Sequence, residues 1–207
     1  MIRVIQGKEH EEYIKLMCKM MYIEKDDMDF YINKNIENSF IYIKNNVVRI
    51  FIKEDKFINS SIIYMLQKYR FLCCTQNKNM NPTLLELLDC YLANYYSLTF
   101  AIDLVEKMNI ITKDSCFDLS KTKQAIIEIC NNTILNYRLD EELTISKKSG
   151  KMIACRNVLR KYNNFDIDFV RESNTFADKL EELEWFNIEE KYDEIVQAFN
   201  EYITEID

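Results

Sequence analysis

The stretch from Pro82 to Met108 is apolar on nearly every helical face, and it constrains the fold more than any other feature of this sequence. Asn81 is a favoured N-cap residue and Pro82 a favoured first helical residue, so the pair predicts where a helix begins. A helix that is apolar nearly all round must be enclosed by other elements. We therefore predict a mainly α fold (α-rich α+β) around a buried central helix. Its apolar residues recur at alternating spacings of four and three: Leu84, Leu88, Tyr91, Tyr95, Leu98, Ile102 and Val105.

A coiled-coil seam is the alternative interpretation of this helix. It is the weaker one, because a seam needs more heptads and charged flanking positions than this stretch has. The scarcity of glycine (2) and proline (1) also favours helices over tight turns. An AT-rich genome produces the same scarcity without any structural cause. An accessory protein of an AT-rich virus fits this composition, and so does a protein from a protist or a low-GC bacterium.

The chain is long enough to bury a sizeable core and short for two full domains. We therefore predict one globular domain over residues 1–207. Within it, an N-terminal subregion 1–54 would carry a hairpin, and 55–207 would form a helical body. The sequence contains no repeat and no clear linker that would mark a domain boundary.

Two β-hairpins are predicted. The first joins the β-branched and aromatic runs 39–43 and 47–52 through Lys44-Asn45-Asn46, residues that tolerate left-handed backbone. The apolar spacing of this stretch also fits a helix, and we favour the hairpin because propensity and turn chemistry agree. The second hairpin is expected over 143–154, turning at 147–150.

The remaining elements are predicted from local patterns. A strand is expected over Ile2–Ile5 and another in the run FDIDF around Asp166 and Asp168. Helices are expected from Lys8, over 55–74, from Ser120, in a short segment that ends at Tyr162, and in two acidic segments that close the chain, the last of which opens at Asn187.

The seven cysteines indicate free thiols in a reducing compartment. An odd count without a signal-peptide pattern argues against a secreted disulfide framework. We therefore expect a cytoplasmic protein, with the nucleus as the alternative. No membrane span is expected, because the uncharged run of the central helix, Cys90–Ile102, is shorter than the roughly 20 apolar residues that a span needs.

No motif predicts catalysis, a metal or a cofactor. The one histidine, His10, lies in a charged run and is expected to be an exposed residue at a helix start. An enzyme with a Ser-His-Asp or Cys-His catalytic site would have to use this residue, so the sequence argues against both kinds of enzyme. No C-x-x-C pair and no glycine-rich phosphate loop occurs. Asp166 and Asp168 could hold a cation on one face of a strand, but such alternation is equally what a half-buried strand shows. We expect a non-enzymatic protein.

The charge distribution is strongly asymmetric. From Asp166 to Asp207 there are fourteen acidic and three basic residues, a net charge of −11. A basic hairpin followed by a helix could bind a nucleic-acid backbone. We favour the other interpretation, that the acidic helices neutralise this segment within the protein, because an acidic chain is repelled by phosphates. The segment from Ser146 to Phe165 carries six basic residues and no acid: Lys147, Lys148, Lys151, Arg156, Arg160 and Lys161.

A second candidate surface is the short apolar group Leu183, Trp185 and Phe186, expected to be exposed between the acidic helices. Tryptophan is enriched at protein-binding hot spots, although it could equally close over the core. We therefore expect a protein–protein interaction or regulatory protein with a protein partner. The alternative is an RNA-binding protein that uses the basic segment 147–161.

Overall fold

The fold is mainly helical with one small sheet, as the sequence predicts. The computed structural model describes residues 1–23, 27–75, 79–113, 117–136, 141–163, 175–183 and 187–206. By its internal contacts the chain divides into two compact units, Met1–Arg70 and Phe71–Asp207. Whether 1–207 folds as one domain with a subregion 1–54 stays a prediction.

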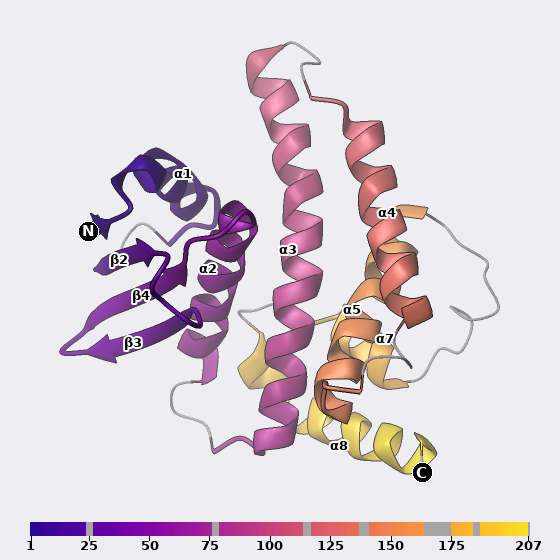
Figure 1. Cartoon of the computed structure of the whole chain (residues 1–207). Coiled ribbons are helices and arrows are strands. Elements are labelled where there is room, and N and C mark those ends of the chain that lie inside the picture. Colours follow the sequence, from indigo (N-terminus) through magenta and orange to yellow (C-terminus); the bar gives the residue numbers. More distant parts are fainter. Residues whose placement is uncertain are drawn as a thin grey trace. The chain divides into compact units, whose positions relative to one another are not determined.

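The first unit is built on a four-stranded sheet of order β1-β2-β4-β3. Strands β1, β2 and β4 run parallel, and β3 pairs antiparallel with β4 (Figure 1). The last helix of this unit, α2, continues across the boundary between the units. The elements of the first unit are β1 (Ile2–Gln6), the 3-10 helix η1 (Lys8–His10), α1 (Glu11–Met20), β2 (Met28–Asn33), β3 (Phe40–Lys44), β4 (Val47–Lys53) and α2 (Ile58–Thr75).

The predicted hairpin at 39–52 is confirmed as β3 and β4, and the helical alternative is wrong. Asn45 and Asn46 take positive φ angles of 52° and 61°, which a type I′ turn requires at both central positions. Strand β2 was not anticipated from the sequence. It lies inside the sheet and is buried on both faces over most of its length, so it lacks the alternation that marks a half-buried strand.

The second unit is a helical bundle around α3 (Pro82–Thr112), which Figure 1 shows as a long helix with α4 and α5 alongside it. The side chain of Asn81 caps α3 by accepting hydrogen bonds from the backbone of Thr83 (2.9 Å) and Leu84 (3.4 Å), as the sequence predicts. The other helices are α4 (Leu119–Asn136), α5 (Ile145–Asn163), α7 (Thr175–Glu181) and α8 (Ile188–Ile206).

The prediction of a second hairpin over 143–154 is wrong, because residues 145–154 belong to the continuous helix α5. Gly150 was interpreted as a turn residue, but it is the point at which α5 meets α3. A Cβ atom at Gly150 would lie 2.6 Å from the carbonyl oxygen of Leu87, so only glycine allows the two backbones to approach this closely. The predicted short helix ending at Tyr162 is the C-terminal part of the same α5.

The described helices include none that is both long and apolar enough to cross a lipid bilayer.

Candidate protein-binding groove

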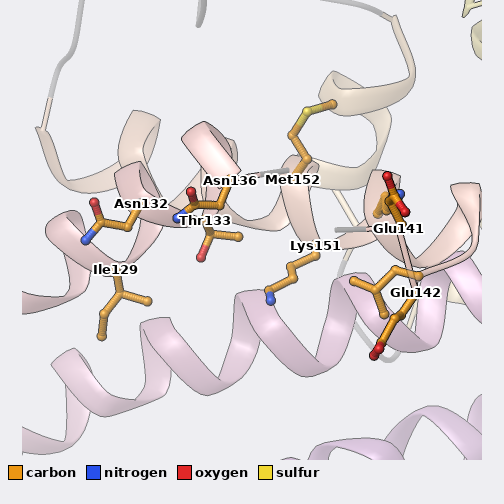
Figure 2. Close-up of a pocket in the computed structure, with 10 residues that line it drawn as sticks. Ile129, Asn132, Thr133, Asn136, Glu141, Glu142, Lys151 and Met152 are labelled. Atoms are coloured by element: carbon orange, nitrogen blue, oxygen red, sulfur yellow. The ribbon is translucent and has the colours of Figure 1, made fainter. Parts of the chain in front are cut away.

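A groove of about 810 Å³ opens between α4, α5 and the short segment that precedes α5. In Figure 2, Lys151 lies between the polar side chains of α4 on one side and Glu141 and Glu142 on the other. We call this the α4–α5 groove. Its lining residues are Ile129, Asn132, Thr133, Asn136, Glu141, Glu142, Leu143, Lys148, Lys151 and Met152.

Helical periodicity explains how these residues come together. The four from α4 follow one another at intervals of three, one and three residues, which places them on one face of a helix. The three from α5 follow the same rule. Helix α5 packs against α3 at Gly150, whereas Lys148, Lys151 and Met152 on its groove side remain partly exposed. Ile129 is 53% exposed, a large value for an isoleucine in a helical bundle.

The four charged residues of the groove have no ion-pair partner within the described part of the chain. Lys148 and Lys151 are half-buried cations on α5, whereas Glu141 and Glu142 are exposed anions on the preceding segment. The groove therefore presents charges of both signs together with apolar surface from Ile129, Leu143 and Met152.

Two buried thiols lie behind the groove. Thr133 of the lining hydrogen-bonds Cys155, which in turn contacts Cys130. The contact with Cys155, and then burial, raise the pKa of the Cys130 thiol. Cys130 and Cys155 are 0% and 2% exposed, so neither offers a nucleophile to a molecule in the groove.

The structure separates the six basic residues of the segment 147–161 into different environments. Only Lys148 and Lys151 line the groove. Lys147 forms an ion pair with Glu86 at 3.2 Å, and hydrogen bonds from Ser146 and Lys147 hold the pKa of Glu86 below its usual value. The hairpin on which a single basic surface depended does not exist.

The three remaining basic residues lie further along α5. Arg156 is buried, with 6% of its surface exposed. Arg160 pairs with Asp178 at 2.7 Å and with Glu181 at 3.1 Å, and these acids belong to the acidic C-terminal stretch. Lys161 stays exposed. Part of the basic segment is therefore neutralised within the protein, and the acids paired with Arg160 are in the C-terminal stretch from which the sequence predicts this.

Leu183, the first residue of the apolar group that was expected to be exposed, is buried. Leu183 is only 1% exposed and belongs to the core of the second unit. Trp185 and Phe186 lie outside the described residues, as do Asp166 and Asp168.

Sequence reasoning missed the α4 half of the groove. Asn132, Thr133 and Asn136 are ordinary helix-surface residues one by one, and the available signal was their common face with Ile129. That signal alone does not distinguish a groove from a solvated helix face.

Comparisons with protein-family models, with curated proteins and with solved structures find no match for this chain.

Proposed function

We propose that this chain is a non-enzymatic protein-interaction protein and that its α4–α5 groove binds a short segment of a partner protein. The observation that carries the proposal is the groove itself: it has room for several side chains, and it combines exposed apolar surface with charged groups that lack partners within the described residues. Such a mixture is typical of non-obligate protein interfaces.

The charges define the segment that would fit. An acidic side chain would pair with Lys148 or Lys151, a basic one with Glu141 or Glu142, and an apolar one would contact Ile129. Glu141 and Glu142 favour a protein over a nucleic acid as the occupant, because two carboxylates at the groove repel phosphates. The net charge of −7 acts in the same direction.

The proposed location is a reducing compartment, with the cytoplasm first and the nucleus as the alternative. The described cysteines Cys18, Cys73, Cys74, Cys90, Cys130 and Cys155 are free thiols, which is typical of such a compartment.

A display selection of short random peptides on the purified full-length chain tests the proposal. We expect enriched peptides that combine acidic, basic and apolar residues. Their affinity should fall at least tenfold in the double variant Lys148→Glu/Lys151→Glu, since the two introduced glutamates repel the acidic side chain of the peptide. The matched control is Lys107→Glu/Lys161→Glu, which changes the net charge equally at exposed positions outside the groove. Equal binding by both double variants, or no enrichment at all, would refute the groove as the binding site.

RNA binding is the second candidate function, and one observation favours it. Lys123 and Lys161 lie 5.9 Å and 5.2 Å from the ring centre of Tyr162, so an aromatic ring and two cations share one surface. Aromatic rings between cations are a common way to hold single-stranded RNA.

Binding of an oligouridine RNA across a salt series separates the two functions. RNA binding would weaken steeply with salt. It would also fall in Lys107→Glu/Lys161→Glu, because this variant reverses the charge of Lys161 beside the Tyr162 ring. Peptide binding in the groove predicts the opposite result: binding falls in Lys148→Glu/Lys151→Glu and is kept in Lys107→Glu/Lys161→Glu.

A further inference from the structure

The carboxyl ends of three parallel strands meet at one edge of the sheet in the first unit. Strands β1, β2 and β4 end at Gln6, Asn33 and Lys53, and β2 lies between the other two. In open sheets of parallel strands, ligands bind just beyond these ends. The chain that follows β1 and the chain that follows β4 are therefore both placed beside the end of β2.

Two hydrogen bonds of Asn33, one donated and one accepted, connect the strands at this edge. Its side-chain amide donates to the side chain of Gln6 at 2.9 Å, and its backbone carbonyl accepts from the backbone of Glu54 at 3.1 Å. Asn33 thus ties the end of β1 and the end of β4 to the end of β2.

A tight turn then brings η1 over the same edge. Gly7 has a φ of +81°, and a Cβ atom there would lie 2.6 Å from the Cβ of Ile32, so both conformation and space require glycine. The backbone of His10 donates to the carbonyl of Gly7 at 3.0 Å, which closes the turn. Glu9 and His10 are held in this way beside Glu54.

The three side chains form a compact cluster. One potential ligand atom from each of Glu9, His10 and Glu54 lies within 4.8 Å of the other two. The Nε2 atom of His10 lies 3.9 Å from a carboxylate oxygen of Glu9. That nitrogen is closed to solvent and has no hydrogen-bond partner among the described residues, and the His10 side chain is only 18% exposed. The expectation of an exposed histidine is therefore wrong.

An imidazole nitrogen that is shielded from water and lacks a partner in the described part of the chain is costly, and a bound ligand would remove this cost. A cation satisfies it and also compensates the two neighbouring carboxylates. Ligand atoms of a tetrahedral site are about 3.4 Å apart when the metal–ligand distance is about 2.1 Å. Small rotations of the two glutamate side chains cover the difference from the observed spacing.

We propose that Glu9, His10 and Glu54 form a binding site for a divalent transition-metal ion, with Zn²⁺ as the ion that the ligands suit best. Imidazole nitrogen and carboxylate oxygen are both ligands of zinc, whereas Mg²⁺ and Ca²⁺ prefer oxygen alone. Three protein ligands leave a coordination position for water or for an oxygen atom of a bound molecule. The site lies in the first unit and is independent of the proposed groove.

The chain contains a single histidine, so its imidazole NMR signals can be assigned without ambiguity. The test is a Zn²⁺ titration of the ¹⁵N-labelled full-length protein, following the two ring nitrogens of His10. We expect a saturable shift of Nε2 at one equivalent of bound metal. This readout reports on His10 alone, so zinc held by cysteine thiols elsewhere does not imitate it.

Three variants make the test specific to the site. Glu9→Gln and Glu54→Gln should each require at least tenfold more Zn²⁺ for the same shift. The matched control Glu12→Gln removes an exposed carboxylate of α1 outside the cluster and should titrate like the original chain. Circular dichroism verifies that the variants are folded. Unmoved His10 nitrogens at high-micromolar Zn²⁺, or a Glu54→Gln titration identical to that of the original chain, would overturn the proposal.

Discussion

The hydroxyl of Tyr91 donates a hydrogen bond of 2.7 Å to the backbone carbonyl oxygen of Leu180, which joins the middle of α3 to α7. Asn157 of α5 donates to the same hydroxyl at 3.1 Å and to the carbonyl of Ala177 at 3.2 Å. Tyr91 and Asn157 are fully buried. A shared polar network therefore connects three helices inside an apolar core, where an unmade hydrogen bond is most costly.

Replacing Tyr91 with phenylalanine tests this network. The substitution keeps the ring but leaves one amide hydrogen of Asn157 without its partner. It also removes the shorter of two hydrogen bonds to the Leu180 carbonyl, which keeps the one from the backbone of Leu183 at 3.3 Å. We expect the free energy of unfolding to fall by about 1–3 kcal/mol. Urea denaturation followed by circular dichroism measures it, with Tyr22→Phe as the control because Tyr22 is 87% exposed. An equal stability of both variants would show that the network contributes nothing.

Gly150→Ala tests the close contact of α5 with α3. The added Cβ would meet the carbonyl oxygen of Leu87 at 2.6 Å and the Cβ of Cys90 at 3.1 Å, and neither atom can move without its backbone. Alanine gains about 1 kcal/mol of helix propensity over glycine. We nevertheless expect a net loss of stability of about 1–3 kcal/mol from overpacking. Lys161→Ala, at an exposed position of the same helix, is the control in urea denaturation. A stabilised Gly150→Ala variant would mean that the helices can separate freely.

The same glycine shows where sequence reasoning fails. The start of α3 was predictable because Asn81 and Pro82 act locally, and the β3–β4 hairpin was predictable because Asn45 and Asn46 set their own turn. Gly150 is required by its close contact with the backbone of Leu87, which lies far away in the sequence. A local interpretation therefore assigned this glycine to a turn and predicted a hairpin where the structure has a helix.

The candidate sites could be predicted only in part, for the same reason. Lys148 and Lys151 were singled out by charge, but the ion pairs that occupy Lys147 and Arg160 come from acids on other helices. The proposed metal site joins His10, which follows β1, to Glu54, which follows β4, and no sequence spacing predicts this contact. Burial of Leu183 likewise depends on how the helices pack.

Arg3 and Asp29 give a prediction for the first unit. They face each other in the register of β1 and β2, and the guanidinium donates two hydrogen bonds to the carboxylate, at 2.7 and 3.1 Å. Asp29 is only 5% exposed, whereas about half of the Arg3 side chain, 51%, reaches solvent. Arg3→Met therefore leaves a buried carboxylate without its main partner, and we expect a loss of about 1–3 kcal/mol.

The double variant Arg3→Met/Asp29→Leu supplies the control for this pair. It removes the carboxylate as well, so it should recover most of the lost stability. Both variants are measured by thermal and urea denaturation. If the double variant is no more stable than Arg3→Met, the unpaired carboxylate is not the cause of the loss.

Tyr95 predicts a loss of stability at alkaline pH. Burial, followed by the nearby carboxylates of Glu181 and Asp103, raises the pKa of Tyr95 from 10.0 to about 12. The folded protein therefore favours the protonated phenol, so this contribution to stability is fully present below pH 10 and is lost as the pH rises toward 12. No hydrogen bond of the Tyr95 hydroxyl occurs among the described residues, which makes Tyr95→Phe a mild substitution.

Urea denaturation at intervals between pH 10 and pH 12 should show a shallower decline of the free energy of unfolding for Tyr95→Phe than for the original chain. Tyr22→Phe removes an exposed phenol and should follow the original curve, and two parallel curves for Tyr95→Phe and the original chain would contradict the prediction.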